Sequence, residues 1–262
     1  MESTAPPSVP AAKKLTVLDG IGSVELLDTF GDDLTVVNAA RVSFAKTVTE
    51  MEPRDAKLVK YLADHNHITP FFHPQARFRL KMPIYVAREW FRHTIGFARN
   101  EVSRRYVDDK AECYVPAPGQ LRERDANKKQ GSKPTPIADE AAWRERVASF
   151  QEGAVAFYEE LLAAKVAPEV ARGVLPQSMY TEFIETASLS AYARLCGLRC
   201  DPHAQVEIQA YARAVSELLA PAFPVSWAAL APAEEVVKPA AAAAPAPVHD
   251  ASQQSANVNF VI

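Results

Sequence analysis

The sequence predicts a protein of the α/β class, of the α+β kind, in which helices pack against a sheet. Side chains in residues 76–81 alternate between apolar and basic, which is the period of a strand with one buried face. Residues 54–64 instead repeat their apolar side chains at helical spacing, and residues 140–164 do so over a longer stretch. Strands and amphipathic helices therefore occur in one chain.

Length and composition indicate one globular domain. The chain has 262 residues, of which 48% are hydrophobic, and this suits a single domain with a substantial core. We place the domain at residues 13–230, with a polar surface insertion at 117–139. The Pro-, Ser- and Ala-rich tails, residues 1–12 and 231–262, are predicted to be disordered.

Charge and cysteine content argue against several classes of protein. A net charge of −3 and a pI near 6.1 disfavour a nucleic-acid polymer or a membrane surface as partner. The three cysteines, together with the lack of a signal-like start or a long apolar run, predict a cytoplasmic protein. The spacing of Cys196, Cys200 and His203 fits no common zinc site, so no metal is expected.

The first elements are two strands and a helix. Residues 14–18 and 24–27 are short apolar runs separated by glycines, and we expect them to pair. A buried helix is expected over residues 36–44, with Arg41 and Ser43 at its exposed end. After the helix at 54–64 and the strand at 76–81, the chain reaches a proline.

That proline, Pro83, suits the first position of a new helix, which we expect to run to His93. Gly96 is expected to end it. Residues 97–106 are then left as a loop that binds a ligand.

The second half is predicted to be mostly helical. A strand is expected at 179–184, a helix at 187–198, and a last helix that opens within 198–208 and has Asp201 as its N-cap. The helix at 140–164 carries an apolar stripe: Trp143, Val147, Phe150, Ala154, Phe157, Leu161 and Leu162.

Residues 89–106 carry the strongest functional signal. They hold five basic side chains: Arg92, His93, Arg99, Arg104 and Arg105. Cations this close repel one another, so packing alone does not favour them. Guanidinium groups suit phosphates and the carbonyl edge of a base. Because aromatic residues alternate with the charges, part of the segment must be buried, and buried arginines need partners. A bound anion is the natural candidate.

The segment resembles the signature of the flavin-dependent thymidylate synthases. That signature is Arg-His-Arg, a spacer, and Asn-Glu-x-Ser-x-Arg-Tyr, and it is matched here by Arg92-His93 and by Asn100-Glu101-x-Ser103-x-Arg105-Tyr106. Two features depart from it. Thr94 stands where the family has its second arginine, and the spacer before Asn100 is one residue longer.

Four further blocks resemble the same family in a consistent order. They are Ala-Ala-Arg-Val-Ser-Phe at 39–44, His-x-Thr-Pro-Phe-x-His at 67–73, Ala-Arg-x-x-Leu-Pro at 171–176, and Leu-Arg-x-Asp-x-His-Ala-Gln-x-Glu-Ile at 198–208. Phe72 replaces a glutamate that is common in the second of these blocks. The resemblance covers roughly residues 14–227.

The resemblance implies a fold, an assembly and a reaction. The fold is a mixed or antiparallel sheet with helices packed against it, and the assembly is a homotetramer whose active sites are shared between subunits. The reaction converts dUMP to dTMP with FAD, NADPH and methylene-tetrahydrofolate, so folate and dUMP are the small-molecule partners.

The resemblance also assigns residues to the two ligands. Those for FAD are Ser43, His67, Thr69, Arg92, His93, Glu101 and Arg194, to which Arg99 is added below on other grounds. Those for dUMP are Glu89, Arg92, Glu101, Ser103, Arg104, Arg105, Arg172 and Arg199. Ser103, Arg105, Arg172 and the backbone near Arg104 hold the phosphate. Arg199 faces the ring carbonyls, and Arg92 touches both ligands, so these two are the catalytic candidates.

Arg99 is assigned for a reason specific to this chain. Thr94 cannot supply the positive charge that an arginine brings beside the flavin. The longer spacer contains Gly96, which frees the backbone to turn. We therefore expect Arg99 to reach back across the turn and supply that charge. The competing account is that Arg99 pairs with Glu101 or with solvent.

The chemistry can be argued from the residue types. Methylation at uracil C5 requires a nucleophilic C5, and one route adds a cysteine thiolate to C6. None of the three cysteines matches a ligand position of the five blocks. Fixed positive charge that polarises the ring carbonyls, beside a reduced flavin, is the other route, and the arginines favour it.

Three alternatives stay open. A metal-dependent nucleotide phosphohydrolase would use His65, His67, His73, His93 and an acid such as Asp64. A non-catalytic nucleotide-binding module would explain the arginines without a redox cofactor. A related flavin enzyme would transfer a one-carbon group to another pyrimidine nucleotide.

Overall fold

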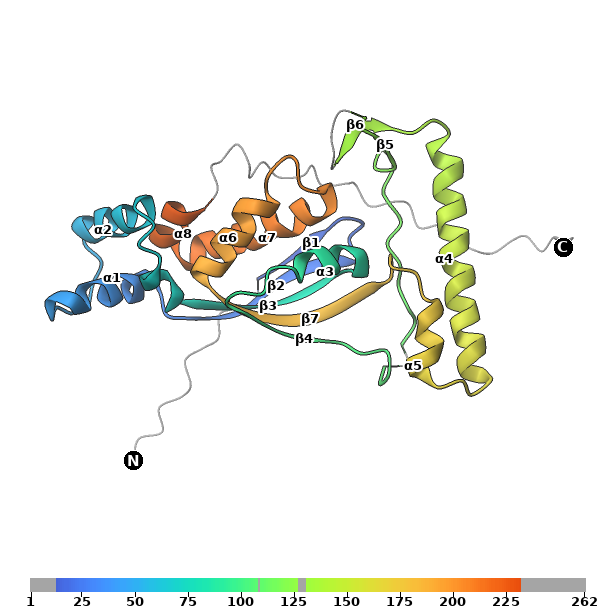
Figure 1. Cartoon of the computed structure of the whole chain (residues 1–262), viewed down its shortest axis with the longest axis horizontal. Helices are drawn as coiled ribbons and strands as arrows, with labels where there is room; N and C mark the ends of the chain where they lie inside the picture. The colour runs from blue at the N-terminus through green and yellow to red at the C-terminus, as the bar shows by residue number, and fades with distance from the viewer. Residues whose placement is uncertain (1–12, 108, 127–130, 232–262) are drawn as a thin grey trace, which may run out of the picture.

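The computed structural model describes residues 13–107, 109–126 and 131–231. Its centre is a five-stranded antiparallel sheet of order β1-β2-β3-β7-β4, with helices over one face (Figure 1). The predicted fold class is confirmed. The tails predicted to be disordered lie outside the described residues, apart from Ala231. No helix among the described residues is long and apolar enough to cross a membrane.

The strands are joined in a way that brings distant segments together. The first two form the expected hairpin, and the third and fourth in chain order both pair with β7, which therefore lies between them. Their bounds are β1 Lys13–Val17, β2 Gly22–Phe30, β3 Gln75–Pro83, β4 Phe97–Glu101 and β7 Tyr180–Ser188.

The sheet has one buried and one charged face. Along β3 the side chains of Ala76, Phe78 and Leu80 are buried, as the alternation predicts. Their neighbours Arg77 and Arg79 point to the other face and pair with acids on the adjacent strands: Asp28, Glu25 and Glu182. The helices therefore cover only the apolar face.

One group of helices packs on that apolar face, and a second group lies at one end of the sheet (Figure 1). Those on the face are α3 Ile84–Trp90, α6 Leu189–Arg199 and α7 Val206–Ala222. Those at the end are α1 Asp33–Arg41, η1 Val42–Phe44, α2 Pro53–Asp64, η2 Thr69–Phe72 and α8 Pro224–Leu230. The core between them is built on large buried side chains: Phe78, Trp90, Tyr192, Tyr211 and Trp227.

Local sequence explains where the end helices begin. Asp32 caps α1 in a reciprocal capping box with Thr35. The buried carboxylate of Asp33 accepts from the backbone N–H groups of Val225 and Ser226, at 2.8 and 2.7 Å, and so ties α8 to α1. These contacts fix the end of the molecule that carries Ser43.

The long helix lies at the opposite end of the sheet, away from the main core (Figure 1). It packs through Gln151, Val155 and Tyr158. The stripe predicted from the sequence is only partly covered, because Trp143, Phe150 and Phe157 are 46%, 70% and 49% exposed while its other members are half-buried. The elements here are β5 Arg122–Arg124, β6 Ser132–Pro136, α4 Glu140–Ala163, α5 Pro168–Ala171 and η3 Arg172–Val174.

Three local predictions are wrong. The helix after Pro83 ends at Trp90 and not at His93. Residues 97–101 form strand β4 on β7, so only the remainder of 97–106 is a loop. Asp201 does not cap the last helix, which begins at Val206. Its carboxylate instead accepts from the backbone N–H of His203 in the preceding turn, at 2.7 Å.

Candidate active site

The signature segment is anchored to the sheet by one buried carboxylate. Glu185 on β7 accepts from the indole N–H of Trp90, at 3.1 and 3.2 Å to its two oxygens, and pairs with the guanidinium of Arg99. Arg99 also donates to the backbone carbonyl of His93, at 2.6 Å. The Arg99 side chain therefore spans the turn between α3 and β4 and holds its two sides together.

The turn itself depends on Gly96. Its φ is +82°, a backbone region that suits glycine. A Cβ at this position would lie 3.2 Å from Cβ of Ala191 at the start of α6. The close approach places the turn directly against the helix that ends at Arg199.

Arg99 reaches back across the turn to the His93 carbonyl, and its charge is paired with Glu185 rather than with Glu101. Its side chain is 14% exposed and its partner Glu185 is fully buried, so the pair with Glu101 is not formed. The guanidinium carbon lies 4.6 Å from the ring centre of Phe97 and 5.3 Å from that of Phe91. Burial raises the pKa of Glu185, and Arg99 opposes this shift. A role for Arg99 toward FAD stays a prediction.

Glu185 was not predicted from the sequence, although a signal for it exists. The residue is an acid at an inward position of strand β7, between buried Phe183 and Ala187. An acid among inward apolar positions of a strand indicates a buried cationic partner. The partner lies opposite on β4, where Arg99 is in register with Glu185.

A second group joins residues that the sequence assigned to different ligands. Arg199, at the end of α6, donates from Nε to Nε2 of His93 at 2.9 Å. Its Nη1 pairs with the carboxylate of Glu89 on α3. Burial, and then the charges of Arg199, Arg99 and Arg194, lower the pKa of His93 to about 4. The imidazole is therefore neutral at pH 7.

This group lies at a cavity of about 810 Å³, here called the Arg199 cavity. Glu89, Arg92 and Arg199 line one side, and the other side comes from the β5–β6 hairpin and the turn before α7. The cavity combines cationic and acidic groups around an open space, an arrangement that can hold an anionic ligand with hydrogen-bonding carbonyls.

The hairpin corrects one expectation about the 117–139 insertion. The insertion was predicted to lie on the surface, but its Arg122 is 13% exposed and pairs at 2.8 Å with Glu207 of α7, itself 7% exposed. Arg122 also donates to Ser132 and Gln120, each at 2.7 Å. The hairpin is therefore latched to the domain and forms a wall of the Arg199 cavity.

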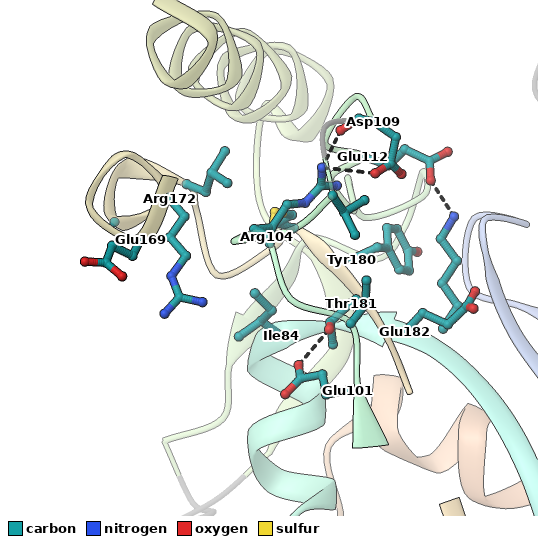
Figure 2. A pocket seen from close by; sticks show the side chains of 16 residues that line it. Ile84, Glu101, Arg104, Asp109, Glu112, Glu169, Arg172, Tyr180, Thr181 and Glu182 are labelled. Carbon is teal, nitrogen blue, oxygen red and sulfur yellow. Dashed lines mark hydrogen bonds and ion pairs between the residues drawn. The ribbon is translucent and has the colours of Figure 1, made fainter. Parts of the chain in front are cut away.

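A separate cavity of about 450 Å³ contains other residues assigned to the nucleotide, and we call it the Arg172 cavity. Figure 2 shows Arg172 extending into it, with no contact drawn to another of the residues shown. Glu101 accepts from the Thr181 hydroxyl at 2.6 Å. Arg104 is turned toward Asp109, contacting its backbone carbonyl and, at 3.5 Å, its carboxylate. The side chain of Arg104 is thus already paired, which fits a phosphate contact through the backbone nearby.

Ser103 and Arg105 lie together at the exposed end of the signature. The Nε of Arg105 donates to the Ser103 hydroxyl at 3.2 Å, and its guanidinium stacks at 5.1 Å over the exposed ring of Tyr106. Neither residue lines the two cavities.

The remaining flavin candidates lie at the other end of the sheet. Ser43, His67 and Thr69 are exposed on or beside the short turns η1 and η2. Exposed apolar side chains lie on the same turns, with Phe44 at 74%. Arg194 on α6 is exposed and donates to the Ile95 carbonyl at 2.6 Å. Among the described residues, no three His, Cys, Asp or Glu side chains gather as a metal site.

An antiparallel sheet that presents two arginine-lined cavities defines a protein that binds an anionic, carbonyl-bearing ligand such as a nucleotide. Residues 25–225 match the family model described as thymidylate synthase complementing protein. A flavin-dependent thymidylate synthase of Thermosipho africanus is 41% identical over 200 residues, or 75% of this chain and 85% of that protein. One of Thermus thermophilus is 41% identical over 218 residues, 82% and 77% of the two chains.

Solved structures agree. The UMP/dUMP methylase PolB of Streptomyces cacaoi, bound with 5-Br dUMP, superposes with a TM-score of 0.71 at 32% identity, covering 79% of this chain and 93% of that chain. A second structure of the same methylase holds 5-Br UMP, with a TM-score of 0.66. The chain belongs to the family of flavin-dependent thymidylate synthases, as the signature predicts.

Proposed function

We propose that this enzyme catalyses the reductive methylation of dUMP to dTMP, with FAD as cofactor, methylene-tetrahydrofolate as one-carbon donor and NADPH as reductant. One observation carries the proposal. Arg199, Glu89 and Arg92 line one cavity, and His93 from the flavin half of the signature contacts the same Arg199. A nucleotide-polarising group and a flavin-side group are thus joined in one network. The choice of NADPH and of the folate follows from the family resemblance.

Arg199 is the residue proposed to polarise the uracil carbonyls. It keeps N–H donors beyond those used by His93 and Glu89, because a guanidinium forms a fork of several. Fixed charge in a partly buried site stabilises the electron-rich ring better than the same charge in water. Glu89 holds the guanidinium in place.

A thiolate route is disfavoured by where the cysteines lie. Cys196 and Cys200 are fully buried and none of the three cysteines lines the Arg199 cavity. Burial raises the pKa of the Cys113 thiol, which makes a thiolate harder to form at that position. Arginine electrostatics are therefore left to activate C5.

The residues present fit FAD in their chemistry. Ser43, His67 and Thr69 offer exposed polar groups beside apolar side chains, a mixture suited to an amphipathic ring system. The buried Nη2 of Arg99 has no hydrogen-bond partner in the chain, so a further acceptor close to the signature is accommodated. When bound and reduced, FAD supplies hydride chemistry.

We further propose that the active sites are shared within a homotetramer. The nucleotide candidates divide between the Arg172 and Arg199 cavities, and the flavin candidates Ser43, His67 and Thr69 lie at another end of the chain. Contributions from several subunits would bring them to one ligand set. The exposed stripe of α4 supplies an interface, because its members recur with the alternating four- and three-residue spacing of helix pairs.

The spectrum of freshly purified protein is the first test. We expect a yellow protein that releases FAD on denaturation. A colourless protein that carries zinc and cannot be reconstituted with FAD would favour the phosphohydrolase. Arg199→Ala should weaken dUMP binding about tenfold to a hundredfold, since a lost charge-assisted hydrogen bond costs about 1.5–3 kcal/mol. Unaltered dUMP affinity in a folded variant contradicts the role given to Arg199.

A second substrate is favoured by one observation. The similar methylase was solved with analogues of both dUMP and UMP, and the signature here departs at Thr94. Methyl transfer to UMP should therefore be measured beside that to dUMP. A preference for UMP would identify the related flavin enzyme that the sequence left open.

A further inference from the structure

The contact between Arg199 and His93 determines which ring nitrogen of His93 carries the proton. An arginine Nε carries a hydrogen at every pH that a protein tolerates and can only donate. His93 Nε2, 2.9 Å away, must therefore present its lone pair. A neutral imidazole that accepts at Nε2 carries its proton on Nδ1.

We infer that Arg199 is a positioning residue that holds His93 as the neutral Nδ1–H tautomer, so that this imidazole meets its ligand as an uncharged hydrogen-bond donor. The tautomer follows from the contact alone. That the ligand is FAD rests on the proposed function.

The surrounding charges reinforce the assignment. His93 is buried, and the cations that face it are Arg199, Arg99 and Arg194. Two of these arginines form ion pairs with acids: Arg199 with Glu89, and Arg99 with Glu185. An imidazolium would place a further cation among the guanidiniums and would lose its acceptor lone pair. Both effects favour the neutral ring.

The arrangement also links the two binding regions. The His93 contact uses Nε of Arg199, and the Glu89 contact uses Nη1, which leaves Nη2 free of both. A nucleotide carbonyl can therefore be bound without breaking the contact to His93. Replacing Arg199 should consequently disturb both the nucleotide side and the protonation of the flavin-side imidazole.

Nuclear magnetic resonance of the full chain, labelled with ¹⁵N at histidine and stripped of flavin, tests the assignment directly. The His93 signals are identified by their loss in His93→Gln. We expect Nδ1–H in the wild type, with the ring neutral from about pH 8 to below about pH 6. Arg199→Ala should raise the His93 pKa by at least about one unit, a tenfold change in the fraction protonated.

Two matched variants separate charge from geometry. Arg199→Lys keeps the cation but loses the planar Nε–H, so the ring should stay neutral while the preference for Nδ1–H weakens. Arg194→Ala removes a cation that does not contact the ring, so the pKa should rise without a change of tautomer. If the Arg199→Ala chain does not fold, the lysine variant carries the test.

The outcomes are distinct from those that bear on the overall activity. Nε2–H in the wild type, or an unchanged tautomer in Arg199→Lys, overturns the inference even if the protein is yellow and methylates dUMP. A dominant Nδ1–H signal that depends on Arg199 supports it even if another pyrimidine proves to be the substrate.

Discussion

Replacement of Arg99 by alanine should destabilise the folded chain before it affects any ligand. The change leaves the fully buried carboxylate of Glu185 without its cation and frees the His93 carbonyl. Removing one partner of a buried ion pair costs about 3–5 kcal/mol. The indole N–H of Trp90 still donates to Glu185, so we expect the lower half of that range. The melting temperature should fall by roughly 6–16 °C.

The pH dependence identifies the cause. Burial raises the pKa of Glu185 above its unfolded value, so between the two values the folded state binds more protons and its stability falls as pH rises. Loss of Arg99 removes a cation that opposes this shift, so the pKa rises further. The deficit of Arg99→Ala relative to wild type should therefore be largest near pH 8 and shrink as the pH falls toward about 5.

Urea unfolding of flavin-free protein at one fixed protein concentration measures this free energy. Thr94→Ala is the matched control, because Thr94 is exposed on the same turn and should cost under about 0.5 kcal/mol. The double variant Arg99→Met/Glu185→Leu should recover much of the loss. A deficit below about 1 kcal/mol, or one that does not change with pH, would refute the ion-pair reasoning. If Thr94→Ala also lowers FAD content more than Arg99→Ala, Arg99 does not supply the flavin-side charge.

Three further outcomes are expected. Phe150 lies in the centre of the α4 stripe, and Phe150→Asp should shift the assembly toward smaller species in sedimentation. Ser149→Asp, at an exposed position outside the stripe, should not. If the two variants behave alike, α4 is not part of the interface. Arg122→Ala removes the cation paired with Glu207 and should speed proteolysis within 117–139 by about tenfold or more. The matched control is Lys133→Ala, whose pair with Glu123 is exposed and whose loss should change the rate little. Replacing all three cysteines by alanine should lower stability by about 1–3 kcal/mol yet keep methyl transfer, and a folded variant that binds dUMP without turnover would point to a thiolate.

The local sequence pattern predicted helices and strands better than it predicted which distant segments they pair with. The alternation along β3 reports which face is buried, and the structure confirms it at Phe78 and Leu80. Residues 97–101 were read as a loop because their pairing is to β7, more than eighty residues away. The same holds for Arg122, whose partner Glu207 is 85 residues distant. A single charged run looks solvated when its counter-ion comes from another element.

The spacing of apolar residues along a helix also does not reveal which part of the protein covers its apolar face. The stripe of α4 was identified by its spacing, but the helix packs on the chain through a neighbouring face that carries Val155 and Tyr158. The blocks of the family signature indicated Arg199 and His93 separately. Their direct contact depends on how closely the Gly96 turn approaches α6, which is a property of tertiary packing.

The position of β7 between β3 and β4 determines whether the binding site can unfold separately from the rest of the fold. Thr181 on this strand donates a hydrogen bond to Glu101, and Glu185 binds Arg99 and Trp90. Ser188, at the end of the strand, caps the helix that ends in Arg199. Local fluctuations that open a single loop would leave these anchors intact. Exchange of β7 amides with deuterated solvent should therefore be among the slowest in the chain and should occur only through global unfolding. On heating, nucleotide binding and flavin retention should disappear in one step, together with the fold.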